Sequence, residues 1–417
     1  MQIGPITHCQ SCGASPLESV LFVGYLPPVN TMPPAGQALG EQTCYPLHLM
    51  FCPACTLAQI NFVAPPEILF APDYPYTTGT TKILRDNFAQ LAEEATEVLG
   101  LKTSQLVVDI GSNDGTLLSN FYKRGHPVLG IEPTDKSQLA NAAGVRSWNR
   151  FFNTECAAQV VKELGRPALV TAANVFAHIP EPVAIVKAIA DMIGDDGVFI
   201  NESHYFLSLV ETLQYDTIYH EHLRYYSLKS MVRLLETAGL RVFNVKLIPT
   251  HGGSIRVYAS RNPNYQPNES VAKQLQAEES FGLHTPARLR RFAQDTFKSK
   301  SDLLILLEQL RSKNQRIFAI GAPSRASTLV NYCGLDQSLV EAVMEVSGSH
   351  KIGKLMPGSD IPVDNEARLY AEQPEYALLF SWHIAEEIIP NLVRKGFKGD
   401  FIVPLPTPRI IKNPGAR

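Results

Sequence analysis

The 417-residue sequence predicts an α/β protein in three parts, a small cysteine-containing module followed by two doubly wound α/β domains. Two C-x-x-C pairs lie within the first 55 residues. An apolar segment that runs into a glycine-rich turn and then a helix occurs at residues 105–116, and the same succession returns at residues 316–326. We therefore expect the three parts to span residues 1–70, 71–265 and 266–417.

The composition indicates a soluble globular protein, with 45% hydrophobic and 18% charged residues. The net charge of −3 gives no electrostatic reason to expect a nucleic-acid partner. No apolar run reaches the roughly 18 residues that span a bilayer, and we expect no secretory signal because the first residues lack a basic stretch followed by an apolar one. We therefore expect a cytoplasmic monomer without a membrane partner, in which cysteines are free thiols or metal ligands rather than disulfides.

Four cysteines form two C-x-x-C pairs, Cys9 with Cys12 and Cys52 with Cys55. Two such pairs brought together supply the four thiolates of a closed, structural zinc site. Chance pairs and two surface disulfides are the alternatives. The proline-rich segment between the pairs is expected to be irregular. The other cysteines are expected to be small buried hydrophobes: Cys44, Cys156 and Cys333.

The first glycine-rich turn, residues 111–115, follows a predicted apolar strand. Glycines let the backbone approach a ligand, and the helix that follows offers free N–H groups. The next strand ends in Glu132, where an open α/β sheet places a carboxylate on a ribose. Asn113 replaces the middle glycine of a dinucleotide fingerprint, and Asp109 and Asp114 disfavour a phosphate. The turn therefore favours S-adenosylmethionine over NAD, since the sulfonium and amino groups of adenosylmethionine are positive.

Polar side chains also follow the next two predicted strands. Ligands of doubly wound sheets sit at the carboxyl ends of the strands, so Asn174, His178, Glu202 and His204 are expected to face one crevice. A partnered structural residue is the alternative for each histidine. The residues expected to bind the cofactor are Asp109, Gly111, Asn113, Asp114, Gly115, Glu132 and Asn174.

Residues 219–226 read Tyr-His-Glu-His-Leu-Arg-Tyr-Tyr, with five imidazole or phenol groups and one carboxylate in eight positions. Such side chains suit a dry core poorly, but they exchange protons near neutral pH. A cofactor turn followed by an acid/base cluster predicts an enzyme that removes a proton and then transfers a group.

The second glycine-rich turn, residues 321–325, carries Ser324 and Arg325 where the first carries acidic residues. Serine and arginine suit phosphate oxygens, so this turn is a candidate phosphate site. An arginine that only pairs on the surface is the alternative.

These motifs, together with the His-Gly-Gly-Ser sequence at residues 251–254, resemble one family along essentially the whole chain: the sugar C-methyltransferases of deoxysugar biosynthesis. That family methylates nucleotide-linked 4-keto-6-deoxyhexoses. The resemblance implies a small zinc module, a Rossmann-like adenosylmethionine-dependent methyltransferase domain, and a C-terminal α/β domain that helps to hold the nucleotide, dTDP or GDP. It also implies that the reacting centre is lined by Tyr76, His178, Tyr219, Glu221 and His222.

The chemistry supports this assignment independently, because methylation of carbon needs a carbanion and only a proton next to a carbonyl is acidic enough for a side-chain base. A 4-keto sugar provides such protons at C3 and C5, of which we favour C3. His222 is the candidate base, Glu221 would orient an imidazole or hold a hydroxyl, and zinc would take no part. The remaining candidates for substrate binding are Glu202, His204, His251, Ser324 and Arg325.

Two other functions compete with this hypothesis. A sugar O-methyltransferase needs only one base or a metal, and no enolate pocket. A zinc-ribbon nucleic-acid-binding protein needs a basic stripe, whereas the first 60 residues contain no lysine or arginine.

Overall fold

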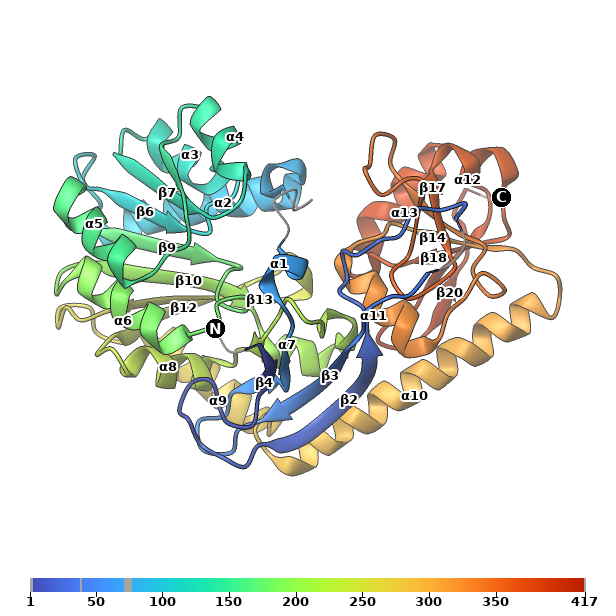
Figure 1. The fold of residues 1–417 in the computed structure, drawn as a ribbon, viewed down its shortest axis with the longest axis horizontal. Helices are drawn as coiled ribbons and strands as arrows, with labels where there is room; N and C mark the ends of the chain where they lie inside the picture. Colours follow the sequence, from blue (N-terminus) through green and yellow to red (C-terminus); the bar gives the residue numbers. More distant parts are fainter. Residues whose placement is uncertain (1–2, 38–39, 71–76, 416–417) are drawn as a thin grey trace.

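The computed structural model describes residues 3–37, 40–70 and 77–415, and it has the expected three-part α/β organisation (Figure 1). Tyr76, expected at the reacting centre, lies outside the described residues. In the described part of the chain, no helix combines the length and apolarity that crossing a bilayer requires.

The N-terminal module is built on a four-stranded antiparallel sheet in the order β11-β4-β3-β2. The expectation of an irregular segment between the cysteine pairs is wrong, because two of these strands lie within it. In β3 the buried Leu47, Leu49 and Phe51 alternate with less buried residues, which is the pattern of a half-buried strand. The strands of the module, with the short pair β1–β5 and the helix α1, are β1 (Gly4–Pro5), β2 (Glu18–Leu26), β3 (Tyr45–Phe51), β4 (Ala58–Ile60), β5 (Phe62–Val63), α1 (Pro66–Leu69) and β11 (Arg224–Tyr225).

The middle domain has a seven-stranded sheet in the order β12-β13-β10-β9-β6-β7-β8, in which only β13 runs antiparallel to its neighbours. Helices α2, α3 and α4 pack on one face of the sheet, and α5, α6 and α8 pack on the other, so the expected doubly wound arrangement is confirmed (Figure 1). The strands are β6 (Val107–Ile110), β7 (Val128–Glu132), β8 (Ser147–Asn149), β9 (Leu169–Ala173), β10 (Val198–His204), β12 (Arg241–Ile248) and β13 (Ser254–Ser260). The helices are η1 (Thr78–Thr80), α2 (Lys82–Leu99), α3 (Thr116–Lys123), α4 (Lys136–Ala142), α5 (Thr154–Leu164), α6 (Pro182–Ile193), α7 (Phe206–Glu211), η2 (Tyr215–Thr217), α8 (Leu228–Glu236) and η3 (Thr250–Gly252).

The C-terminal domain has a second seven-stranded sheet, with five parallel strands between two antiparallel edge strands. Helices α12 and α13 cover one face, while α10 and α11 cover the other. The elements are β14 (Ile317–Ile320), α11 (Ser324–Cys333), β15 (Ala342–Glu345), β16 (Lys354–Leu355), β17 (Pro362–Asn365), α12 (Ala367–Glu372), β18 (Tyr376–Leu379), η4 (Trp382–Ile384), α13 (Ala385–Arg394), β19 (Asp400–Val403) and β20 (Arg409–Ile411).

Two helices join the domains, α9 (Glu269–Phe281) and α10 (Pro286–Arg311). Gly282 ends α9 with a φ of 70°, a left-handed conformation that glycine adopts without strain. The Thr285 side chain then caps α10 by accepting a hydrogen bond from the backbone N–H of Arg288. In Figure 1, α10 passes beneath β2 and reaches the C-terminal domain, so one helix contacts the first and last parts of the chain.

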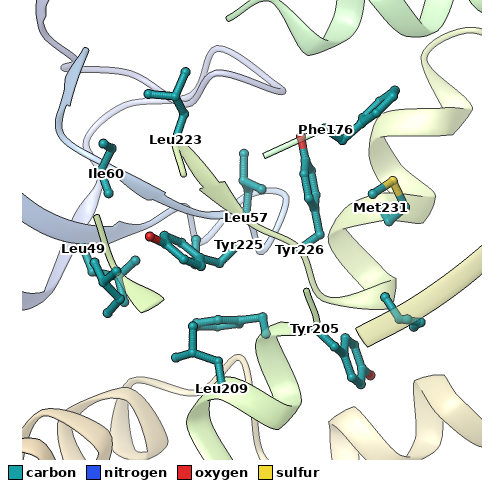
Figure 2. Packing of buried hydrophobic residues seen from close by; sticks show 14 of the residues in the cluster. Leu49, Leu57, Ile60, Phe176, Tyr205, Leu209, Leu223, Tyr225, Tyr226 and Met231 are labelled. Carbon is teal, nitrogen blue, oxygen red and sulfur yellow. The ribbon is translucent and has the colours of Figure 1, made fainter. Parts of the chain in front are cut away.

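A continuous apolar core joins the N-terminal sheet to the middle domain (Figure 2). Leu57 and Ile60, beside and within β4, lie next to Leu223 and Tyr225 in Figure 2, and these residues are at most 3% exposed. At about 25 cal/mol per Å² of apolar surface, side chains buried to this extent contribute ~1.5–3 kcal/mol each. The first sixty residues are therefore packed against the segment that carries the acid/base run.

Candidate active site

The four paired cysteines converge on one point of the N-terminal module. Their sulfur atoms lie within 4.8 Å of one another, with Cys9 3.4 Å from Cys55 and Cys12 3.6 Å from Cys52. A tetrahedral ion with Zn–S bonds of about 2.3 Å would separate the sulfurs by about 3.8 Å, so this cluster fits zinc closely. Because each C-x-x-C pair contributes one partner to each short contact, the geometry does not match two disulfides within the pairs.

The charges of these thiols also fit a cation. A hydrogen bond with Cys55 lowers the pKa of Cys9 to about 5, while burial raises the pKa of Cys52 to about 11. Because burial opposes the ionisation of Cys52, a second thiolate in the cluster needs a nearby positive charge, which a metal ion would provide. Cys156 and Cys333 are buried as expected, whereas the expectation for Cys44 is wrong because this residue is exposed.

Replacement of Cys52 by serine should abolish stoichiometric zinc binding and lower the activity as well as the stability. The reason is structural: Arg224, which lies within the acid/base run, donates from its Nη1 to Gln10 Oε1 at 2.9 Å, and Gln10 lies between the first two cysteines. Elemental analysis of the purified protein measures the metal, and Cys44→Ser is the matched control. A Cys52→Ser protein with one equivalent of zinc would contradict the assignment.

The first glycine-rich turn lies where β6 meets α3. Gly111 has a φ of 70°, and a Cβ atom there would come 2.4 Å from Val175, so the turn requires glycine for conformation and for space. The side chains of Asn113 and Asp114 accept hydrogen bonds from the backbone N–H groups of Thr78 and Gly79, at 3.0 and 2.9 Å. These two side chains therefore hold the 3₁₀ turn η1 against the cofactor loop.

Two carboxyl groups flank this turn at the ends of β6 and β7. Glu132 accepts the backbone N–H of Asn113 at 2.9 Å and the Thr134 hydroxyl at 2.6 Å, which fixes its orientation. Burial raises the pKa of Asp109 to about 7, and Glu132 adds to the rise, although Asp109 accepts a hydrogen bond from the Thr171 hydroxyl at 2.6 Å. Two adjacent buried carboxyl groups favour a positively charged ligand, as expected for adenosylmethionine.

The acid/base run places Tyr219 and His222 side by side. The Tyr219 hydroxyl lies 3.1 Å from His222 Nε2, and the two ring centroids are 4.2 Å apart. His222 Nδ1 lies 3.2 Å from the carbonyl oxygen of Thr217, which can only accept a hydrogen bond. Nδ1 therefore carries the proton, and Nε2 has the lone pair that can accept one.

His178 and Glu221 join this pair, so the structure brings together every described residue expected at the reacting centre. The ring of His178 lies 5.0 Å from that of His222, and its Nδ1 donates to the backbone oxygen of Glu221 at 2.7 Å. The Glu221 carboxylate accepts a hydrogen bond from Asn30 Nδ2 at 2.7 Å. Neighbouring His220 turns away toward the N-terminal module, where its Nε2 lies 3.3 Å from the carbonyl oxygen of Pro46.

Further histidines surround this centre and all are held neutral. Burial lowers the pKa of His178 to about 4, of His204 to about 3 and of His251 to about 4, and the charge of Arg325 adds to the fall at the last two. The pKa of His222 is lowered well below its usual range, first by burial and then by the other histidines. His251 also has a left-handed φ of 57° and a buried Nε2 without a partner in the described part of the chain.

The expectation that Glu202 binds the substrate is not supported. Glu202 is fully buried, and its carboxylate accepts hydrogen bonds from Asn87 at 2.7 Å and from Arg256 Nε at 3.0 Å. Arg256 is itself fully buried and also pairs with Glu94. Burial of an unpaired carboxylate costs free energy of folding. Glu202 on β10 avoids this cost by its hydrogen bonds to Asn87 on α2 and Arg256 on β13, so its role here is structural. Asn174, one strand away, has a φ of 60° and donates its backbone N–H to Glu202 O at 2.7 Å.

The expectation that Arg325 binds a phosphate is also not supported. Its Nε and Nη2 atoms both donate to Asp216, at 2.8 Å each, in a bidentate pair between the C-terminal and middle domains. Trp382 Nε1 donates to the same carboxylate at 2.8 Å. The planar fork of the guanidinium is therefore occupied by protein. Ser324 does lie at the junction, with its hydroxyl 3.5 Å from Asn30 Oδ1.

Sequence reasoning missed Asn30, Asp216 and Lys351, which lie at this junction. Each belongs to a segment without a motif, and its contacts are with residues more than 25 positions away. One signal was available for Lys351, since it follows the strand after the second glycine-rich turn.

Family models match three successive regions of the chain. They are described as "Putative zinc binding domain" for residues 9–70, "Methyltransferase domain" for residues 82–245, and "C-methyltransferase C-terminal domain" for residues 249–406. A curated relative, C-methyltransferase NovU of Streptomyces niveus, is 31% identical over 98% of both chains.

Solved structures resemble part of the chain. A magnesium protoporphyrin IX methyltransferase from Synechocystis with bound adenosylmethionine matches 43% of this chain and 83% of its own, with 17% identity and a TM-score of 0.33. An adenosylmethionine-dependent methyltransferase from Clostridium acetobutylicum matches 44% of this chain and 94% of its own, with 12% identity and a TM-score of 0.34.

Proposed function

Because the chain belongs to the family of adenosylmethionine-dependent C-methyltransferases, we propose that it methylates the carbon next to the ketone of a nucleotide-linked 4-keto-6-deoxy sugar, at C3. The observation that carries this proposal is the pair of Tyr219 and His222, whose hydroxyl and Nε2 atoms lie 3.1 Å apart. An imidazole that is neutral at physiological pH, with its Nδ1 proton directed at a carbonyl, is ready to act as a base.

In the proposed reaction, the Tyr219–His222 pair takes the C3 proton and the electrons of the C–H bond form an enolate with the ketone oxygen. Tyrosine or histidine N–H and O–H groups stabilise that oxygen as charge develops on it. Residues 111–115 would hold adenosylmethionine, which would supply the electrophilic methyl group for the enolate carbon and leave as adenosylhomocysteine. His178 holds the run in place through the backbone of Glu221 and contributes a neutral ring to the site.

The proposed cofactor position puts adenosylmethionine over residues 111–115, with Glu132 on its ribose and the positive sulfonium near the buried carboxyl of Asp109. The pKa of Asp109 supports this position. Burial raises that pKa to about 7, and a nearby cation would stabilise the ionised form of the carboxyl group. Zinc would stay structural, because four cysteines leave no open coordination position.

Incubation with adenosylhomocysteine and a 4-keto-6-deoxy sugar nucleotide in deuterated water tests the function. Proton exchange next to the ketone, followed by methylation of the same carbon when adenosylmethionine is supplied, is the expected result. NMR locates both events. A sugar O-methyltransferase would place the methyl group on oxygen without requiring exchange, and this outcome would replace the proposal.

Glu132→Ala should weaken the binding of adenosylhomocysteine about tenfold to a hundredfold, since each 1.4 kcal/mol of lost hydrogen bonding is about a factor of ten. Calorimetry measures the affinity. Thr134→Val removes the hydroxyl that orients Glu132 but keeps the carboxylate, so its effect should be smaller. Unchanged affinity in Glu132→Ala would place the cofactor elsewhere.

A further inference from the structure

The second glycine-rich turn holds a lysine that comes from a later loop of the C-terminal domain. Lys351 Nζ donates to the backbone oxygen of Ala322 at 2.5 Å. The backbone N–H of Ala322 donates to Glu345 Oε1 at 2.6 Å, at the end of the neighbouring strand β15. Within the described residues, this carbonyl is the one hydrogen-bond acceptor of the ammonium group, which has three N–H donors.

The same turn is connected to the reacting centre through Asn30. The Asn30 side chain lies 3.5 Å from the Ser324 hydroxyl and donates to Glu221 at 2.7 Å. Glu221 in turn acts electrostatically on Lys351, as does Glu345. Lys351 therefore lies within electrostatic range of Glu221, although the two residues belong to different domains.

Other lysines lie within electrostatic range of His350, the residue before Lys351. Burial lowers the pKa of His350, and the charges of Lys351 and Lys354 in the same loop and of Lys136 in the middle domain lower it further. Lys136 begins α4, four residues after Glu132 at the cofactor turn.

We propose that Lys351 binds the diphosphate of the nucleotide-linked substrate, the role that the sequence suggested for Arg325. This inference rests on the proposed function, because a nucleotide-linked sugar brings two phosphates to the junction between the domains. A half-buried ammonium with unused donors gains most from an anion, and lysine binds phosphate as a point charge. The fork of Arg325 is held by Asp216, so Lys351 is the cation of this turn that remains for the substrate.

Calorimetry with the zinc-loaded protein tests the role of Lys351. The wild type is first screened with dTDP, GDP, UDP and CDP, and the diphosphate that binds is compared with its nucleoside. Lys351→Met should weaken the diphosphate about tenfold to a hundredfold, the loss expected for a charged hydrogen bond. The affinities for the nucleoside and for adenosylhomocysteine should stay within about twofold. Lys351→Arg, which keeps the charge, should retain most of the diphosphate affinity.

Lys354→Met is the matched control, since it removes a neighbouring positive charge that does not contact the turn, and it should weaken the diphosphate less than about threefold. A wild type that binds one diphosphate and a Lys351→Met variant that binds it equally well would overturn the role of Lys351 alone. If Lys351→Met and Lys354→Met weaken diphosphate binding equally, the effect comes from the overall positive charge of the loop, and the role of Lys351 is overturned. A wild type that binds none of the four diphosphates would overturn both this inference and the proposed substrate class.

Discussion

His222→Asn is expected to lower turnover by a factor of about 10²–10⁴, the usual contribution of a positioned base. Asparagine is compact and polar, so the affinities for cofactor and sugar nucleotide should persist. Hydrogen exchange next to the ketone should fall together with turnover, because exchange needs the same removal of a proton. Single-turnover methyl transfer and NMR of the exchange provide the two measurements.

The neighbouring His220 provides the matched control. His220 is buried whereas His222 is partly exposed, and the Nε2 of His220 is directed at Pro46 in the N-terminal module. His220→Asn should therefore affect stability more than exchange. Should His222→Asn keep normal exchange while Tyr219→Phe loses it, the base is Tyr219 and the proposed assignment within the pair is wrong.

The pH dependence of turnover follows from the direction of the His222 pKa. Burial holds this pKa well below the usual 6.5, so Nε2 is unprotonated at neutral pH. The rate should therefore stay level as the pH falls through 6.5 and should drop only when the pH reaches the lowered pKa. An activity lost with a midpoint at the ordinary histidine value would indicate an exposed base.

Asp216→Ala is expected to lower the free energy of unfolding by about 3–5 kcal/mol, because it leaves the buried guanidinium of Arg325 without its counter-charge. The side chains of Asp216 and Arg325 are 1% and 8% exposed, so water cannot replace the lost partner. Denaturant titration measures the loss, and the double variant with Arg325→Met should lose less than the sum of the two single variants.

An exposed ion pair on α10 is the comparison for this effect. Arg291 and Asp295 are 65% and 38% exposed, and Asp295→Ala should cost less than about 1 kcal/mol. If Arg325→Met instead leaves the free energy of unfolding unchanged and raises the KM for the sugar nucleotide, the arginine binds substrate. Its pair with Asp216 would then contribute little to stability.

Local patterns in the sequence predicted the parts of the site that are local in the chain. Each cysteine pair, the turn at residues 111–115 and the run at residues 219–226 lies within a few residues of sequence, and the residue types of each indicate its chemistry. The strand β3 could also have been predicted, because Leu47, Leu49 and Phe51 alternate with less buried residues.

Long-range partners could not be predicted in this way. An arginine next to a serine in a glycine-rich turn looks the same whether it meets a phosphate or an aspartate. Arg325 pairs with Asp216 because of how the two domains pack, and the sequence around Arg325 does not indicate that packing. Glu202 is similar, because its partner Arg256 pairs with it across two strands whose register is set by the whole sheet.

The position of β11 in the N-terminal sheet affects the order in which the protein can form during synthesis. Strand β4 leaves the ribosome early, yet its pairing strand β11 follows about 165 residues later. Until then β4 has an open edge beside the apolar Leu57 and Ile60, and open edges invite pairing between chains. The metal-binding cysteines are all present by residue 55, so capture of zinc can organise the module before its last strand arrives. A chain made without sufficient zinc would lack this organisation while the edge of β4 is still open.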